Sequence, residues 1–329
     1  MNFFAVLFAL LCEQLKPLPH GNKVHLSVIA WVRWTGRNFD AGQTHHANVV
    51  WAITVLGPAL LAALIHIALS QFSLILALAF NVLVLYLTLG FRQFSHYFTD
   101  IRDALERADE FEARRLLAEW RHLDASELPR TELLRHVIEH SLLAAHRHVF
   151  GVFFWFILLS TLALGPAGAV LYRMAEFASR YWAFKSRTID APTNERLMLV
   201  SRRLFGLVDY LPTRLTATGF AIVGNFEEAV NSWRRDAALW LHPNEGIILA
   251  AAAGALGVQL GGAAAPGITP DRSKTFGAGG DAEATGAAGS TAGQLPQLGH
   301  LQSVVGLIWR SVVLWMLLLA LLTHANLVG

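Results

Sequence analysis

Residues 49–90, VVWAITVLGPALLAALIHIALSQFSLILALAFNVLVLYLTLG, contain no aspartate, glutamate, lysine or arginine. A helix that crosses a bilayer needs about 20 predominantly apolar residues. Two such runs fit into this stretch, Val49–Ser70 and Phe72–Gly90, with only Gln71 between them. Their length and lack of charge predict helices that lie in a membrane.

Three further apolar runs follow along the chain. Phe150–Tyr172 and Ser303–Thr323 are both long enough to cross a bilayer. Leu204–Gly224 is a weaker candidate, because Asp209 and Arg214 would each cost about 2.5–3.5 kcal/mol in mid-membrane. We therefore expect this run to be re-entrant or to lie at the membrane interface.

The composition supports the same class of protein. Of 329 residues, 54% are hydrophobic and only 15% are charged, which is too apolar for an ordinary soluble domain. The net charge of +2 gives no sign of nucleic-acid binding. The single cysteine, Cys12, excludes an internal disulfide and a cysteine-rich metal site, and its apolar neighbours predict a buried thiol. We predict an all-α, polytopic integral membrane protein with about four to six membrane helices and a soluble helical hairpin.

Changes in composition divide the chain into five parts. Most of the charge lies in the proposed hairpin, where apolar residues recur at helical spacing from Asp100 to Trp120, and a second helix begins near Thr131 and runs into the third span. The later Gly/Ala-rich segment has no periodicity and predicts a flexible loop. The parts are N-terminal membrane helices (1–90), the soluble hairpin (91–149), a membrane and interfacial core (150–262), the flexible loop (263–299) and a C-terminal membrane helix (300–329).

The first polar candidate is the patch Asp209-Tyr-Leu-Pro-Thr-Arg214 inside the weaker apolar run. In one interpretation the carboxylate and the guanidinium line a site at the membrane surface, where the planar fork of Arg214 binds a phosphate or carboxylate through two parallel hydrogen bonds. In the other, the two charges pair with each other at a helix break. The sequence favours neither interpretation.

A second candidate is a cluster of histidines before the third span. His136 and His140 are four residues apart and could share a metal ion, with Glu139 between them as a candidate acid. His146 and His148 lie on another face, and the glutamate of a zincin motif is missing. A polar interfacial face explains this pattern better, and we predict no set of metal-binding residues.

The third candidate is the stretch WRRDAALWLHPNEG, residues 233–246. Arg234 and Arg235 could clamp a phosphate, and Asp236 or Glu245 could hold Mg²⁺ together with it. Asn244 belongs to a turn after Pro243, and Gly246 frees the backbone there. On composition alone, a basic helix start followed by a tightly packed helix explains the stretch equally well.

This stretch, with AAAAGALGVQLGG at residues 250–262, resembles the C-terminal signature of the CobD/CbiB family, integral membrane proteins of cobalamin biosynthesis. Two other segments, FFWFILLSTLALGPAGAVLYR at 153–173 and VDYLPTRL at 208–215, are similar to family segments as well. The residues that match the signature are Arg235, Asp236, Pro243, Asn244, Gly246, Ala253, Gly254, Ala255, Leu256, Gly257, Val258, Leu260, Gly261 and Gly262.

The resemblance implies an amide-forming synthase of the ligase type, which joins adenosylcobyric acid to aminopropanol or its phosphate with ATP and Mg²⁺. It also implies the bacterial inner membrane, a corrinoid substrate, contact with membrane lipid, and a homo-oligomer or other corrinoid-pathway proteins as partners. Residues and resemblance together give Glu139, Asp209 and Asp236 as candidate catalytic residues. The candidate substrate- or phosphate-binding residues are Arg173, Arg214, Arg234, Arg235, Asn244, Gly246, Gly261 and Gly262.

The N-terminal half departs from the synthase pattern. Of the family's E-S-x-x-E-N-x-x-D-G run, only Glu139 and Ser141 have counterparts here, and the acidic opening of the synthases is missing. The start of the chain and the RHVFGVFFW passage at 147–155 look more like AmpE, a related membrane protein tied to β-lactamase induction. The sequence thus allows an active or degenerate synthase, or alternatively an AmpE-like, non-enzymatic sensor.

Overall fold

The computed structural model describes residues 2–16, 23–39, 44–121, 124–186, 194–262 and 290–328, and these residues are almost entirely helical. The described part contains no β-strand beyond two isolated bridges. The elements are α1 (Asn2–Leu15), α2 (Lys23–Phe39), α3 (Thr44–Phe72), α4 (Leu74–Thr88), α5 (Phe91–Glu106), α6 (Glu110–Arg121), α7 (Arg130–Ala145), the π-helical turn η1 (His146–Phe150), α8 (Gly151–Thr161), α9 (Ala167–Ser186), α10 (Glu195–Val208), α11 (Tyr210–Val223), α12 (Phe226–Asp236), the 3₁₀ turn η2 (Ala237–Leu239), α13 (Pro243–Leu256) and α14 (Leu298–Val328).

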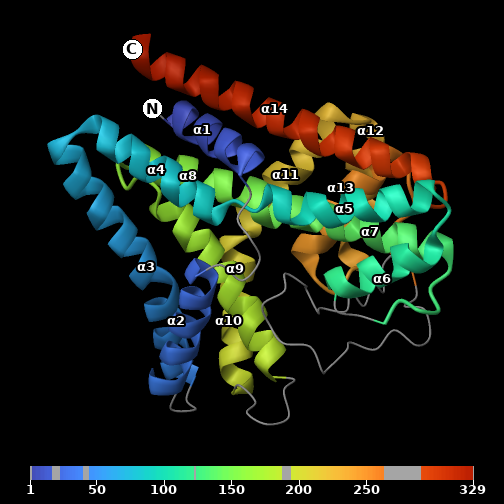
Figure 1. Ribbon diagram of the computed structural model, residues 1–329, viewed down its shortest axis with the longest axis horizontal. Helices are drawn as coiled ribbons and strands as arrows, with labels where there is room; N and C mark the ends of the chain where they lie inside the picture. Colours follow the sequence, from blue (N-terminus) through green and yellow to red (C-terminus); the bar gives the residue numbers. More distant parts are fainter. Residues whose placement is uncertain are drawn as a thin grey trace.

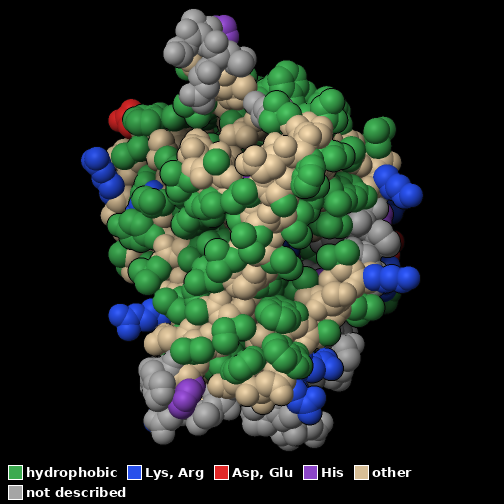
Figure 2. Space-filling model, turned by 90° about the vertical axis from the view of Figure 1, so that its left-hand side faces the viewer, with side chains coloured by type: hydrophobic (Ala, Val, Ile, Leu, Met, Phe, Trp, Pro, Cys, Tyr) green, Lys and Arg blue, Asp and Glu red, His purple; other side chains and the backbone are tan. Residues whose placement is uncertain are grey.

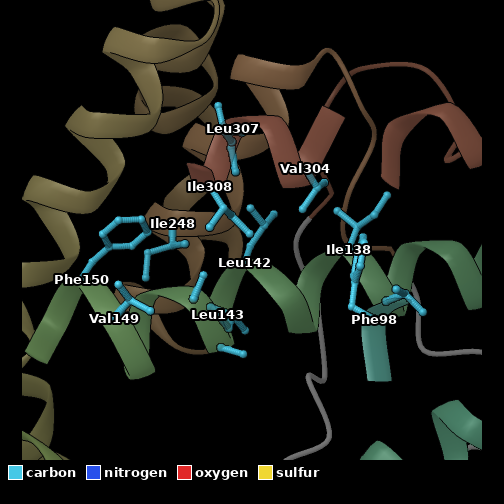
Figure 3. Packing of buried hydrophobic residues seen from close by; sticks show 14 of the residues in the cluster. Phe98, Ile138, Leu142, Leu143, Val149, Phe150, Ile248, Val304, Leu307 and Ile308 are labelled. Atoms are coloured by element: carbon cyan, nitrogen blue, oxygen red, sulfur yellow. The ribbon is translucent and has the colours of Figure 1, made fainter. Parts of the chain in front are cut away.

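The helices form two bundles that meet along α8, α9 and α10 (Figure 1). In the smaller bundle, α2, α3, α9 and α10 run side by side around a core that includes Val50 and Trp182. In the larger bundle, α7 lies at the centre, between α5, α6, α13 and α14. Figure 3 shows its core, where Ile138 and Leu142 of α7 face Val304 and Ile308 of α14.

Three helical segments are long and apolar enough to cross a membrane: His46–Phe72, Arg130–Thr161 and Leu298–Ala325. The first and the last contain the predicted runs Val49–Ser70 and Ser303–Thr323 as uninterrupted helices, which confirms that both runs are helical. The predicted span Phe150–Tyr172 is wrong, because a turn after Thr161 ends the helix and α9 begins only at Ala167. Ala163 and Gly165 adopt positive φ angles in this turn (59° and 57°), which no helix interior accommodates.

The span is instead displaced toward the N-terminus, and it is the central helix of the protein. Two-thirds of its most apolar window is buried inside the protein (67%), compared with 28% and 33% for the other two spans. Its neighbours are therefore mostly protein, while the other two spans present most of their surface outward. The second apolar run forms α4, which at about 1.5 Å per residue is shorter than the hydrocarbon core.

The outward surface of α3 and α4 is strongly apolar. Figure 2 shows hydrophobic side chains over most of this face, with Lys and Arg at its margins. On α3, Leu60, Leu61 and Leu64 are each more than half exposed, as Ile75 is on α4. Such a surface suits lipid and not water. Cys12, predicted to be buried, is exposed on α1 instead.

The segment predicted as a helical hairpin contains three helices. The expected single helix from Asp100 to Trp120 is broken between α5 and α6, where Ala108 has a positive φ of 61°. The next helix begins at Arg130, next to the predicted start, and continues through η1 into α8. All residues of α7 from Leu133 to Ala145 are buried, so this helix belongs to the core of the larger bundle.

The small-residue run AAAAGALGVQLGG, residues 250–262, begins in α13, which packs against α11 and α12. Gly257 ends the helix in the left-handed conformation (φ 69°), as glycine commonly does at this position. The chain then extends, and Val258 and Gly261 form bridges with Gln294 and Ser290. Most of the predicted flexible loop, residues 263–289, lies outside the described residues.

Candidate functional site

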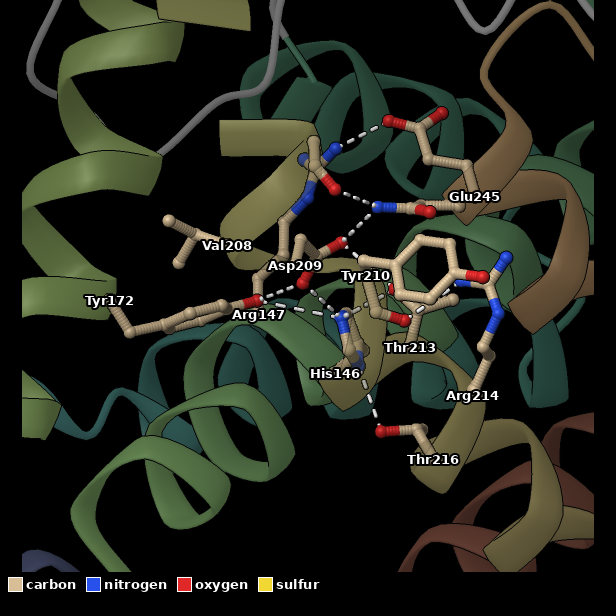
Figure 4. A network of polar contacts seen from close by, with 12 residues as sticks. His146, Arg147, Tyr172, Val208, Asp209, Tyr210, Thr213, Arg214, Thr216 and Glu245 are labelled. Atoms are coloured by element: carbon tan, nitrogen blue, oxygen red, sulfur yellow. Dashed lines mark hydrogen bonds and ion pairs between the residues drawn. The ribbon is translucent and has the colours of Figure 1, made fainter. Parts of the chain in front are cut away.

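The candidate site is built where four helical segments meet: η1, α9, α10 and the start of α13. The π-helical turn η1 interrupts the α7–α8 helix at His146. Such turns place side chains differently from an α-helix and recur at functional sites. Here the turn directs His146 and Arg147 toward Asp209 at the junction of α10 and α11 and Glu245 in α13 (Figure 4).

Asp209 is the centre of a buried hydrogen-bond network (Figure 4). Its Oδ1 accepts hydrogen bonds from His146 Nε2 and from the Tyr172 hydroxyl, each at 2.8 Å. Its Oδ2 accepts from the Thr213 hydroxyl at 2.9 Å and from Asn244 Nδ2 at 3.3 Å. A carboxylate has about four acceptor positions, so this network uses all of them.

The network also sets the charge of its members. Burial alone would raise the pKa of the Asp209 carboxyl, but His146 and the hydrogen bonds from Tyr172 and Thr213 outweigh it and lower the pKa below its usual value. Burial, together with the neighbouring Asp209 carboxylate, raises the pKa of the Tyr172 hydroxyl well above its usual value. Asp209 is therefore a carboxylate, and Tyr172 a neutral donor, across the physiological pH range.

A pocket of about 280 Å³ opens beside this network. Charged groups of its lining form two pairs: Arg147 of η1 contacts Glu245 of α13 at 2.5 Å, and Arg180 contacts Glu176 within α9 at 2.7 Å. The lining residues are Leu143, His146, Arg147, Glu176, Ser179, Arg180, Arg202, Phe205, Gly206, Asp209, His242, Pro243, Asn244, Glu245 and Ile248.

The chemistry of this pocket suits a small anion with polar substituents. Arg147, Arg180 and Arg202 contribute guanidinium groups from three different helical elements. A guanidinium group has five N–H donors, so it can bind a phosphate or carboxylate while it also contacts a glutamate. The N-terminus of α13, where Pro243 is the first helical residue, adds backbone N–H groups and the positive end of the helix dipole.

A second polar centre lies around Glu139 in α7. This side chain is 1% exposed, and its Oε1 accepts a hydrogen bond from the Gly261 backbone N–H at 2.8 Å. Arg135 Nη1 lies 3.9 Å from Glu139 Oε1 and also reaches Glu132. Gly262 lies beside Arg135. The structure thus brings the predicted residues Glu139, Gly261 and Gly262 together, but apart from the pocket.

The other predicted site residues are distributed as follows. Asn244 and Asp209 share the pocket, and Arg173 pairs with Glu176 of its wall at 2.9 Å. The Arg214 guanidinium lies over the Tyr210 ring and donates to the Tyr210 carbonyl, so it neither lines the pocket nor pairs with Asp209.

The predicted phosphate clamp does not line this pocket either. Arg234 is exposed on α12, and the exposed Arg235 pairs with Asp236 at 2.7 Å. Gly246 has a packing role, because a Cβ there would lie 2.5 Å from the Ala237 carbonyl oxygen. The structure therefore places Pro243 and Asn244 of the matched signature at the pocket, Gly246 at a packing contact, and Arg235 and Asp236 outside the pocket.

The sequence interpretation missed Arg147, Arg180, Arg202 and Glu176 as pocket residues. A signal for two of them was present, because Glu176 and Arg180 are four residues apart on one face of α9. Arg202, Gly206 and Asp209 also follow helical spacing in α10. Nothing in the sequence could show that these two faces and η1 converge.

The described carboxylates of the pocket do not form a set of metal ligands. Among the described residues, no three His, Cys, Asp or Glu side chains gather so that they could hold a metal ion. Glu176 and Glu245 are each engaged by arginine, and Asp209 is saturated. These residues do not fit a magnesium site formed by protein ligands alone.

Comparison with known proteins identifies relatives along nearly the whole chain. The protein family described as CobD/Cbib protein matches residues 2–292. The chain is 32% identical over 326 residues, 96% of both chains, to the protein named cobalamin biosynthesis protein CobD of Stutzerimonas stutzeri. It is 34% identical over 226 residues to the protein of that name from Chromobacterium violaceum, covering 66% of this chain and 68% of the relative. No solved structure matches significantly.

Proposed function

This chain belongs to the CobD/CbiB family, and from that premise we propose that it is an amide-forming synthase in cobalamin biosynthesis. The reaction joins a carboxyl group of adenosylcobyric acid to the amino group of aminopropanol or its phosphate. The relatives support a cobalamin biosynthesis protein and do not favour the AmpE-like sensor that the N-terminal half suggested.

The observation that carries the proposal is the pocket with its three guanidinium groups. Amide formation from a free carboxylate needs activation, because hydroxide is a poor leaving group. Phosphoryl or nucleotidyl transfer from ATP makes a mixed anhydride, the amine attacks the acyl carbon, and phosphate or nucleotide leaves. Arg147, Arg180 and Arg202 supply the positive charge that binds phosphate and stabilises the charge that develops on it.

The size of the pocket indicates which substrate it holds. At about 280 Å³ it is at the lower end of ligand pockets and is too small for a corrinoid macrocycle. We propose that the pocket receives the small amine component or a phosphate group. The corrinoid then lies outside the pocket with only its reacting carboxyl directed inward.

ATP and Mg²⁺ remain part of the proposal on the strength of the family resemblance. Because the described carboxylates do not form a metal site, we propose that magnesium arrives bound to the triphosphate. Arg147, Arg180 and Arg202 then bind the phosphates, and none of the described residues is proposed as a ligand of the metal ion.

We also propose that the protein lies in the bacterial inner membrane and crosses it several times. The three candidate spans and the apolar face of α3 and α4 support a membrane protein. A homo-oligomer, or a complex with other corrinoid-pathway proteins, belongs to the same proposal.

The test is complementation in a bacterial host that lacks its own synthase, scored as cobalamin-dependent growth on cobyric acid. Wild-type protein should restore growth, and Arg202→Met should abolish it, because the pocket loses a guanidinium. Arg234→Met is the matched control, since Arg234 is exposed on α12 and does not line the pocket. Failure of the expressed, membrane-inserted wild type to restore growth would contradict the synthase proposal.

A further inference from the structure

Asp209 has no hydrogen-bonding capacity left for a substrate. Four donors, from His146, Tyr172, Thr213 and Asn244, occupy its two oxygens. The side chain is also only 7% exposed. A group in this state is poorly placed to accept a proton from a ligand or to bind a cation, although it lines the pocket.

The one partner of Asp209 that also belongs to the signature stretch is Asn244. Its amide nitrogen donates both hydrogens toward α10, one to the Gly206 carbonyl at 3.0 Å and the other to Asp209 Oδ2 at 3.3 Å. Its carbonyl oxygen Oδ1 has no partner among the described residues. Since Asn244 lines the pocket, Oδ1 is the polar atom that this side chain offers to a ligand.

The surroundings of Asn244 also fix this orientation. A flip of the amide would place Oδ1 against the Asp209 carboxylate and the Gly206 carbonyl, so that acceptors would face acceptors. The negative charge on Asp209 therefore holds the amide with its nitrogen toward α10. The pocket is left with an acceptor of fixed direction, and Arg147 and Arg202 line the same pocket.

We propose that Asn244 Oδ1 recognises the N–H of a primary amine in the pocket, and that Asp209 is a positioning residue that holds Asn244 in the receiving orientation. The inference rests on the proposed function and deepens it, because it assigns the residue that selects an amine. A ligand bearing both an anionic group and an amino group then uses both kinds of lining group: guanidinium for the anion and Oδ1 for the amine.

Equilibrium binding to the full-length, detergent-solubilised protein tests this without any turnover. The probes are 1-amino-2-propanol phosphate and isopropyl phosphate, which lacks only the amino group. We expect wild type to bind the amino compound about tenfold more tightly, the size of one hydrogen bond to a positioned acceptor. Asn244→Leu should bind the two probes with equal affinity.

Asp209→Asn tests the positioning role. An asparagine at 209 can donate to Oδ1, so it allows the Asn244 amide to flip and present its nitrogen to the pocket, and the preference for the amine should fall toward one. Asn38→Leu is the matched control, because Asn38 is exposed on α2 and donates only to its own helix. It should keep the wild-type preference.

The outcomes separate this inference from the synthase proposal. Absence of an amine preference in wild type, or its persistence in folded Asn244→Leu, overturns the inference whether or not the protein is active. A preference that depends on Asn244 in a protein that forms no amide supports the inference and contradicts the synthase proposal.

Where turnover occurs, Asp209→Asn should raise the KM for the amine and leave the pH profile of kcat unchanged. Loss of one limb of that profile with an unchanged KM would show that Asp209 transfers a proton, and would overturn its positioning role.

Discussion

The pocket contains charge pairs whose members depend on each other. Arg147 and Glu245 have side chains that are only 10% and 15% exposed, and they contact each other at 2.5 Å. Removing one charge takes away the partner that the other charge has in this pair, whereas removing both leaves no net charge behind. Loss of one member of the pair should therefore lower the stability more than replacement of both members by uncharged residues.

A comparison of a single variant with the double variant should show this dependence between the two charges. Arg147→Met is expected to lower the free energy of unfolding by about 3 kcal/mol, and Arg147→Met/Glu245→Gln by clearly less. The measurement is the thermal unfolding midpoint of purified protein in detergent. Equal destabilisation by the single and the double variant would show that the two charges do not compensate each other.

Asp209 should make stability depend on acid pH. Because its pKa is lower in the folded protein than in the unfolded chain, its stabilising contribution is complete above the unfolded value of about 3.9 and is lost as the pH falls through the folded value. Asp209→Asn lacks this contribution. The difference in unfolding midpoint between wild type and Asp209→Asn should be constant from pH 7 to about pH 5 and shrink below about pH 4. A difference that stays constant down to pH 3 would contradict the lowered pKa.

Single residues also show where prediction from the sequence ends. Asp209 and Asn244 were identified because they belong to matched or charged stretches, and the structure brings them within hydrogen-bond distance. In one of the two interpretations of the patch, Asp209 pairs with Arg214, five residues away. The structure shows no such pair, and one of the actual partners of Asp209 is His146, which lies 63 residues away in the sequence. Spacing along one helix is readable from sequence, whereas a contact between distant helices is not.

At the scale of elements, the small-residue run of α13 behaves as predicted. Close backbone approach was one expectation for AAAAGALG, and a Cβ on Gly254 would lie 2.2 Å from the Glu228 carbonyl oxygen of α12. Because the obstacle is backbone, it cannot rotate away. The helices α12 and α13 would have to separate to accommodate even a methyl group.

Gly254→Ala should therefore destabilise the protein by about 1–3 kcal/mol, despite the better helix propensity of alanine. Gly306→Ala in α14 is the control, since no atom lies within 4 Å of its added Cβ. That variant should be neutral or slightly stabilising. Unfolding midpoints in detergent give the comparison, and similar values for the two variants would argue against tight α12–α13 packing.

The displaced third span has a physical explanation at the same scale. Hydropathy favoured Phe150–Tyr172 because LALGPAG, residues 162–168, is apolar throughout. The helix ends there in a turn with positive φ at Ala163 and Gly165, and hydropathy carries no information about backbone angles. The buried segment before it contains Arg135, Glu139 and Arg147, whose charges hid its place in the core of the larger bundle.

In the molecule as a whole, exposed apolar residues of different helices should have different surroundings, which are lipid for some and water for others. Leu64 is 64% exposed in the middle of α3, next to Leu60 and Leu61, which are also more than half exposed. Phe111 is 79% exposed on α6, a helix rich in Glu and Arg that is not part of any of the three candidate spans. Exposure alone does not distinguish them, but a membrane around α3 does.

An arginine at each position should separate lipid from water. Leu64→Arg is expected to cost about 2.5–3.5 kcal/mol if α3 crosses the hydrocarbon core, because a charge there loses its hydration. The protein recovered in the membrane fraction after alkaline carbonate washing should fall accordingly. Phe111→Arg faces water and should leave recovery at the wild-type level. Equal recovery of both variants would mean that α3 is not surrounded by lipid at Leu64, and the membrane would then have to be placed along other helices.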